Sequence, residues 1–360
     1  MALPCPMPRL AAIALAAIAV AAGPAGAQKA GGVLKAYHRD NPPSASIHEE
    51  ATISTAQPFS AVFNNLLIFD QHVKTNSLDH LQAELATAWA WSEDMTKLTF
   101  QLREGVRWHD GKPFTAEDVK CTWDTVSGKR DAGWRKNPRE PWYFNLEEIT
   151  TNGRYEVAFH LKRPQPSFLA FLAGGFSPVY PCHVDGREMR SKPIGTGPFK
   201  VAEFRQNEHI RLVRNDDYWK PDRPYLDGVE WRIIQARSTR VLAFIAGEFD
   251  LTFSQDVSIP LLRDVQANAP KAYCELNASN VHGNLLVNRE APPFDDPRIR
   301  RAMVLAIDRP AFITVLSEGR DKIGGAMLPA PAGVWGAPAE YFDPVPGYGP
   351  DIAGNRAEGR

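Results

Sequence analysis

The stretch LTFQLREGVRWHDGKPFTAEDVKCTWDTV, residues 98–126, decides how the rest of this 360-residue chain is interpreted. Its first half alternates apolar and polar side chains, which is the period-two pattern of a half-buried strand. The apolar positions are Leu98, Phe100 and Leu102 and, after Gly105, Val106 and Trp108. The pattern therefore predicts two consecutive strands that lead into a turn.

The second half of the stretch predicts a tight turn followed by a capped helix. His109, Asp110 and Gly111 form the turn, because Asp-Gly supplies the backbone freedom that a sharp reversal needs. No second histidine or metal-ligand spacing accompanies His109, so the His-Asp pair is interpreted as turn chemistry rather than as an acid-base pair. Thr115 and Asp118 have the spacing of a capping box. The helix face predicted after them consists of Val119, Thr122, Trp123 and Val126.

The order of these residues closely resembles a signature of the extracytoplasmic solute-binding proteins of ABC importers, family 5, the peptide/nickel-binding family. The matching positions are Trp91, Ser92, Asp94, Thr99-Phe100, Leu102-Arg103, Gly105-Val106, Trp108 to Gly111 and Pro113 to Ala116. One departure is Met95, where many members carry glycine.

Two later runs extend the resemblance along the chain. The first run is SKPIGTGPFKV, residues 191–201, and a second set of matching positions follows it. The other run is PPFDDPRIRRAMVLAIDR, which begins at Pro292. The second set is Asn215, Tyr218-Trp219 and Leu226-Asp227. A phosphate-binding loop is the competing interpretation of Gly195 and Gly197, but a strand pattern follows these glycines where such a loop needs a helix.

Other segments carry shorter patterns. Helical spacing spans residues 59–67 and recurs at 168–172. Alternation predicts strands at 199–201, 229–233 and 249–253, and a further strand at 285–287. The helix expected around 299–306 is followed by one that Asp308 caps, and Asp351 is a plausible N-cap near the end of the chain.

The first 27 residues have the pattern of a secretory signal peptide. Arg9 supplies the positive charge, residues 10–22 are an unbroken apolar run, and Ala25-Gly26-Ala27 is a cleavage motif. The run is too short to span a bilayer. We therefore expect export to the periplasm with cleavage after Ala27, and no lipid anchor, because no cysteine follows in a lipobox position.

Cysteines and charge exclude several classes of protein. Cys121, Cys182 and Cys274 remain after the signal peptide, too few and too widely spaced for a disulfide framework or a zinc site. A single bridge between Cys182 and Cys274 is one open alternative. The formal net charge is −1 with both signs interspersed, so no nucleic-acid partner is expected. No metal and no cofactor is predicted.

The resemblance implies an α/β fold of the periplasmic binding protein type (type II, cluster C), with two lobes and an extra domain. By likeness, domain I comprises 31–66 and 188–255, domain II comprises 67–187, and domain III runs over 256–360. We expect domain III to be incomplete and the C-terminal part to be missing, because in the family the segment matching the last residues starts a helix that continues. Bare apolar surface and binding of a hydrophobic dye would follow.

The resemblance also implies capture of a peptide or related small solute, delivered by a monomer to inner-membrane ABC permease subunits. Thr52 and Ile53 stand where relatives line the cleft. Trp142 and Tyr143 are either ligand-stacking aromatics or core residues, and Asn284 is a further candidate for a hydrogen bond to the ligand. The family's Asp-Pro-His motif is Ser46-Ile47-His48 here, a loss of two residues that weakens the peptide assignment.

Two alternatives to peptide capture stay open. Within the binding class, the ligand is a sugar or opine, or nickel or haem. The candidate metal ligands are His48 and the pair Cys182-His183, which has no partner pair at ligand spacing. In another class, the protein is an exported hydrolase. Against a hydrolase, the chain contains neither G-x-S-x-G nor H-E-x-x-H, so no enzymatic activity is expected.

Overall fold

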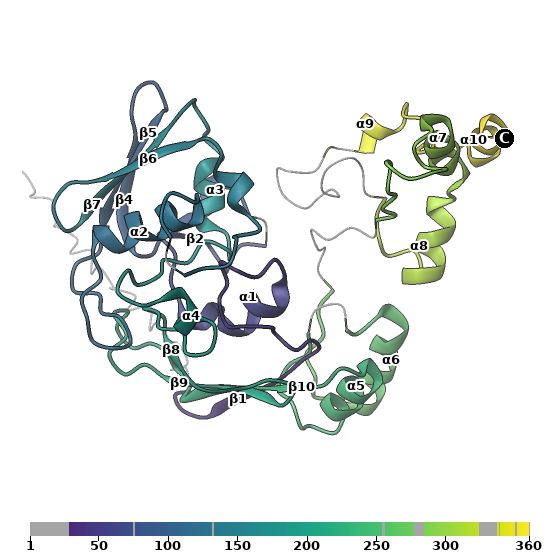
Figure 1. Cartoon of the computed structure of the whole chain (residues 1–360). Helices are drawn as coiled ribbons and strands as arrows, with labels where there is room; N and C mark the ends of the chain where they lie inside the picture. The colour runs from purple at the N-terminus through teal and green to yellow at the C-terminus, as the bar shows by residue number, and fades with distance from the viewer. Residues whose placement is uncertain are drawn as a thin grey trace, which may run out of the picture.

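The computed structural model describes residues 29–74, 76–131, 133–253, 256–276, 284–323, 337, 339–349 and 351–359. The predicted signal peptide lies outside these residues. None of the helices within them is long and apolar enough to cross a bilayer. Figure 1 shows two sheets in the first two thirds of the chain and a separate group of helices, α7 to α10, from the last third.

The first sheet combines the start of the chain with a segment more than 160 residues later. Its order is β1-β10-β9-β8, in which β1 pairs parallel with β10 and the other neighbours are antiparallel. The strands are β1 (Val33–His38), β8 (Phe199–Arg205), β9 (His209–Arg214) and β10 (Gly228–Ile233). The predicted strands at 199–201 and 229–233 are confirmed.

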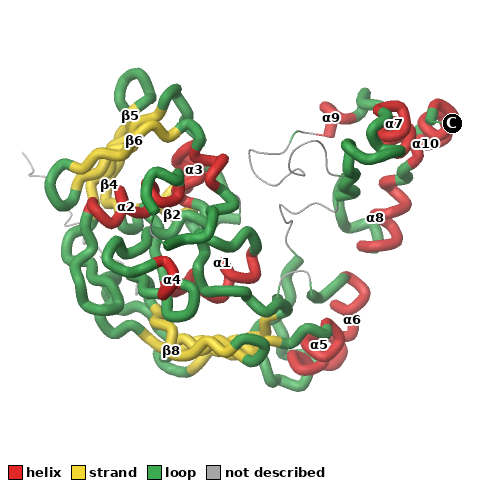
Figure 2. Tube along the Cα trace, in the orientation of Figure 1, coloured by secondary structure: helices red, strands yellow, loops and turns green. Residues whose placement is uncertain are grey.

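The second sheet is built from one continuous part of the chain. Its order is β4-β5-β7-β6 and every pairing is antiparallel. The strands are β4 (Ala86–Trp91), β5 (Lys97–Leu102), β6 (Leu146–Thr151) and β7 (Glu156–Leu161), with the short pair β2 (Leu67–Phe69) and β3 (Leu81–Ala83) beside them. Figure 2 shows the two sheets as separate yellow layers joined by loops and short helices.

Short helices cover and connect the sheets. They are α1 (Ile53–Phe59), η1 (Ser60–Val62), η2 (Leu78–His80), α2 (Ala116–Val126), η3 (Glu140–Tyr143), α3 (Phe168–Ala173), α4 (Gly186–Met189), α5 (Arg237–Ile245) and α6 (Ile259–Asn268). The capping box predicted for α2 is present, with Thr115 and Asp118 bonding reciprocally. Trp123 of α2 packs on Phe159 of β7, with ring centroids 5.4 Å apart, and Phe159 meets Phe168 of α3.

The helices of the last third are α7 (Pro297–Ala306), α8 (Arg309–Ser317), α9 (Ala339–Phe342) and α10 (Ile352–Glu358). The two predicted N-caps are confirmed: Asp308 accepts the Ala311 N–H, and Asp351 accepts the Gly354 N–H. Helix α10 packs against α7. By contrast, the apolar side chains of α8 are mostly exposed, and Phe312 and Val315 keep 59% and 78% of their surface.

Four predicted elements are wrong or shorter than expected. Residues after Gly105 form only an isolated bridge, Arg107 to Pro113, because Gly105 turns the chain with φ of 77°. The strand at 249–253 is one parallel bridge, Ala36 to Leu251. The helix predicted over 59–67 ends at Val62, since Leu67 pairs with β3 instead. Residues 285–287 form no strand, and among the described residues none pairs with them.

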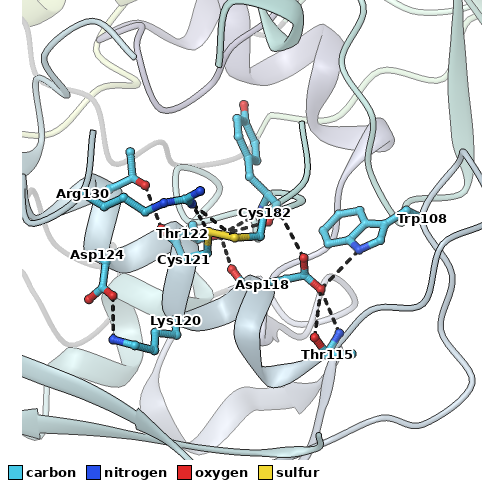
Figure 3. The surroundings of a disulfide bond; sticks show 11 residues. Trp108, Thr115, Asp118, Lys120, Cys121, Thr122, Asp124, Arg130 and Cys182 are labelled. Atoms are coloured by element: carbon cyan, nitrogen blue, oxygen red, sulfur yellow. Dashed lines mark hydrogen bonds and ion pairs between the residues drawn. A yellow bond between two sulfur atoms is a disulfide. The ribbon is translucent and has the colours of Figure 1, made fainter. Parts of the chain in front are cut away.

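The alternative of a Cys182–Cys274 bridge, left open by the sequence, is wrong, because Cys182 pairs with Cys121 and Cys274 is free. Cys121 lies on α2, and its Cα is 5.6 Å from that of Cys182. Figure 3 shows how the capping residue Asp118 helps to hold this region together: it accepts the Cys182 N–H at 2.9 Å and the Trp108 indole N–H at 3.4 Å. The disulfide and the helix cap thus fix the segment around Cys182 to α2.

Candidate functional site

The predicted residues Thr52 and Ile53 lie at the start of α1, on the surface. Thr52 is the N-cap but makes no side-chain capping bond, and Ile53 is 46% exposed. The next residue, Ser54, donates its hydroxyl to Asp40 at 2.6 Å. This bond places the start of α1 beside the carboxyl end of β1, and in α/β sheets that end is where ligands commonly bind.

A pair of opposite charges occupies the same place. Arg39 and Asp40 form an ion pair at 3.3 Å, and both side chains keep more than a third of their surface in solvent. The Arg39 guanidinium also lies over the ring of Phe253, 4.5 Å from its centroid. Burial alone would raise the pKa of Asp40, but the Ser54 hydroxyl and Arg39 outweigh it and leave that pKa below its ordinary value. The surface thus offers one anion, one cation and the apolar Ile53 side chain.

The segment that precedes Thr52 is held by buried ionic contacts. The Glu49 side chain has no exposed surface. Its carboxylate accepts a hydrogen bond from the Arg190 guanidinium at 2.7 Å and another from the Arg135 backbone N–H at 2.6 Å. Burial would raise the pKa of Glu49, yet the Arg190 bonds and the Arg135 N–H together hold it below its ordinary value. Arg139 donates to the backbone carbonyls of Ile47 and Glu50. These contacts come from two distant parts of the chain, residues 135–139 and Arg190, and fix the position from which Thr52 and Ile53 project.

Trp142 and Tyr143, which the sequence analysis treated as one candidate, lie in different environments. Tyr143 is 3% exposed, its hydroxyl is 3.0 Å from that of Ser177, and it belongs to the core beside the second sheet. Trp142 is 44% exposed and stacks on Phe171 with centroids 5.8 Å apart. Of the two, Trp142 is the one whose ring a ligand can reach without rearrangement of the core.

The remaining candidates stand apart from these residues. Asn284 is exposed in a segment without regular structure. Within the described parts of the chain, no hydrogen bond or ring contact joins it to Thr52, Ile53 or Trp142. His48 is 1% exposed, its Nε2 is 2.8 Å from the Pro178 carbonyl, and burial lowers its pKa to about 3. Among the described residues, no group of three or more His, Cys, Asp or Glu side chains is placed to hold a metal.

Sequence reasoning missed a polar network between the two sheets. Asn64 donates to Glu84 at 2.7 Å and accepts from the Thr196 hydroxyl at 3.0 Å and the Trp219 indole at 3.1 Å. Lys220 then pairs with the other oxygen of Glu84 at 2.6 Å. The available signal was the pair of motifs around Thr196 and Trp219, whose shared partner Asn64 no local pattern reveals.

The described residues form a mixed α/β fold with an exposed ion pair beside the carboxyl end of β1, and comparison with known proteins assigns the chain to a family. The family described as "Bacterial extracellular solute-binding proteins, family 5 Middle" matches residues 80–356. The chain belongs to this family, whose members bind solutes and are not enzymes.

Individual relatives are similar over part of their length. The chain is 28% identical over 256 residues to the glutathione-binding protein GsiB of Escherichia coli (strain K12), covering 69% of this chain and 48% of that protein. It is 30% identical over 254 residues to the oligopeptide-binding protein AppA of Bacillus subtilis (strain 168), covering 68% and 45%. The chain thus spans about half the length of these curated relatives.

A solved structure shows the same fold. The periplasmic binding protein DppA of Helicobacter pylori, in complex with the peptide STSA, matches with a TM-score of 0.69 and 24% identity. The match covers 84% of this chain and 61% of that one. The mixed α/β fold of cluster C peptide-binding proteins is thereby shown for the part of the chain that aligns.

Proposed function

We propose that this protein captures a short peptide outside the cytoplasm and delivers it to an ABC permease in the inner membrane. The observation that carries the proposal is the surface beside the carboxyl end of β1. There Arg39 and Asp40 present opposite charges next to the exposed Ile53. A short peptide carries an ammonium group, a carboxylate and apolar side chains, so it matches all three.

The three relatives support the same ligand class. Their names record binding of glutathione, of oligopeptides and of the peptide STSA. An opine or sugar acid carries a carboxylate but lacks the regular backbone amides that pair with strand-like segments of a binding protein. Peptide capture therefore accounts for more of the described surface than the alternatives do.

We infer further that capture is a hinge motion of two lobes. Domain I comprises 31–66 with 188–255 and carries the first sheet, and domain II comprises 67–187 and carries the second. Residues from 256 onward belong to a third domain. Ligand and permease need only favour the closed arrangement over the open one for delivery to work. We expect the mature protein to begin at Gln28 and to act as a monomer.

The proposal is tested by titrating the purified full-length protein with defined probes in a calorimeter. The probes are glutathione, trialanine, mannopine and the nickel–histidine complex. We expect saturable binding of at least one of the two peptides. Binding of mannopine or nickel–histidine, with no heat from either peptide, would contradict the peptide assignment.

A matched pair of variants places the site. Asp40→Asn and Asp70→Asn each remove one partly exposed carboxylate, but only Asp40 lies beside Ile53. We expect roughly a fivefold weaker peptide affinity for Asp40→Asn, because an exposed charged contact contributes about 1 kcal/mol. Asp70→Asn should bind like the wild type. Equal affinities for both variants would remove the β1 surface from the site.

A further inference from the structure

Arg39 is held in one orientation beside the carboxyl end of β1. Its Nε donates to Oδ2 of Asp40 at 3.3 Å. Its guanidinium carbon lies 4.5 Å from the centroid of the Phe253 ring, and that ring is 5% exposed. An ion pair on one edge and a buried aromatic ring against one face leave the planar group little freedom to turn.

The terminal edge of the same guanidinium is free for another partner. Arginine has five N–H donors, and four of them lie on Nη1 and Nη2. Among the residues that the structure describes, none accepts a hydrogen bond from these two atoms of Arg39. The side chain keeps 34% of its surface, so part of the group is open to solvent. Two parallel N–H groups of this kind match the two oxygens of a carboxylate.

The Asp40 carboxylate, by contrast, is already engaged. Its Oδ2 accepts the Ser54 hydroxyl at 2.6 Å as well as Nε of Arg39. Asp40 thereby ties Arg39 to the start of α1. Breaking these bonds would remove the contact that orients the guanidinium. The two opposite charges of this surface therefore have unequal roles, because Asp40 positions Arg39 and Arg39 presents the free donors.

We propose that Arg39 binds the carboxylate of the ligand through Nη1 and Nη2, so that the protein selects peptides that keep a free C-terminal carboxylate. Each of the two nitrogens donates to one carboxylate oxygen, while Nε stays bonded to Asp40. The inference rests on the proposed function and deepens it, because it names the chemical group of the peptide that the site requires. Asp40 is a positioning residue in this arrangement.

Arg232 of β10 provides a matched control in the same sheet. It also pairs with a carboxylate, that of Glu248 at 3.1 Å, and its guanidinium carbon lies 5.6 Å from the centroid of the Phe249 ring. Glu248 occupies Nη1 of Arg232, whereas Asp40 occupies only Nε of Arg39. The terminal edge of Arg232 is therefore already in use, although its side chain is more exposed, at 53%.

The first measurement compares trialanine with trialanine amide by calorimetry on the full-length wild-type protein. The amide has the same backbone and side chains but no C-terminal charge. We expect it to bind roughly thirtyfold more weakly, the usual contribution of hydrogen bonds between charged groups. Equal affinities for the acid and the amide would overturn the proposal. This comparison needs no variant, so it does not depend on whether a variant folds.

The second measurement assigns the preference to Arg39. Arg39→Gln removes the charge and the paired donors, so it should bind the acid and the amide with similar affinity. Arg232→Gln should keep the preference of the wild type. If Arg39 had only a structural role, Arg39→Gln would weaken both ligands by the same factor and leave the preference intact. That result would overturn the proposal.

The third measurement needs no peptide. In full-length protein with ¹⁵N-labelled arginine, sodium acetate should shift the Nε–H signal of Arg39 along a saturating curve, and Arg39→Gln identifies that signal by its loss. Acetamide with matched sodium chloride should leave the signal in place. The Arg232 signal should respond much less to acetate. Equal responses of Arg39 and Arg232 to acetate would contradict a carboxylate site at Arg39.

These measurements separate the carboxylate site from the proposed function. If trialanine binds but its amide binds equally well, peptide capture stands and the role of Arg39 is wrong. If neither trialanine nor glutathione binds while acetate shifts Arg39 selectively, the carboxylate site stands and the proposed peptide class fails.

Discussion

Local patterns predicted elements both in the two-sheet part of the molecule and in the helical group α7 to α10, yet the two regions pack very differently. In the first part, large side chains such as Phe100, Trp123 and Phe159 have no exposed surface. In the second, Phe312 and Leu316 keep 59% and 65% of theirs, although the helix that carries them has its predicted N-cap. Capping and periodicity thus suffice to predict a helix. Burial of its apolar side chains requires a second surface against which the helix packs.

The largest expected effect compares one aromatic from each region. Tyr143→Ala should lower the free energy of unfolding by about 3–5 kcal/mol, because it empties a buried ring site. Phe312→Ala should cost less than about 1 kcal/mol, because the ring is mostly in water already. Urea denaturation of both variants checks this. Equal losses would show that α8 is as well packed as the sheets.

A second test concerns Gly195 in the two-sheet part, where the backbone of Gly195 lies close to the backbone of Val62. Gly195→Ala should cost about 3 kcal/mol or more, since its Cβ would overlap the Val62 carbonyl. Gly175→Ala is the control, because nothing lies within 4 Å of a Cβ there. Thermal melting of the pair distinguishes them, and a neutral Gly195→Ala would mean that the link between the sheets can shift.

A third test uses pH. Burial lowers the pKa of His109 from 6.5 to about 4. Between these two pH values, His109 is therefore protonated in the unfolded chain and neutral in the folded protein. Its stabilising contribution is therefore complete above about pH 6.5 and is lost as pH falls towards about 4. We expect about 1 kcal/mol from this residue, allowing for its partial exposure. His109→Gln should flatten that part of the curve, leaving the loss due to buried His48.

The smallest stability effect is expected for Trp142→Ala. The indole is 44% exposed and contacts mainly Phe171, so its removal should cost about 1 kcal/mol or less. If Trp142 contacts ligand, peptide affinity should fall while the melting temperature barely moves. A large fall in melting temperature without ligand would place Trp142 with Tyr143 in the core.

The sequence was most informative where neighbours along the chain decide the outcome. Thr115 and Asp118 cap α2, and the alternation at 98–102 forms β5, because those contacts are local. Patterns failed where a distant partner decides: residues 249–253 make one bridge, and Cys182 pairs with Cys121 because α2 brings that thiol close. Composition and spacing carry no signal for such a choice.

The candidate site shows the same limit. The sequence identified Thr52 and Ile53 only by likeness, and it had no signal for Arg39 and Asp40, whose role follows from the bond between Ser54 and Asp40. It paired Trp142 with Tyr143, which a short 3₁₀ helix turns to opposite environments. Burial of one and exposure of the other depend on α3 and therefore on tertiary structure.

The central claim, capture of a short peptide, is tested most directly by native mass spectrometry of the protein purified from its native host without added ligand. We predict a bound species that dissociates as a mixture of short peptides, and that disappears when the protein is unfolded and refolded without ligand. A single bound opine, sugar or metal complex in place of peptides would contradict the account.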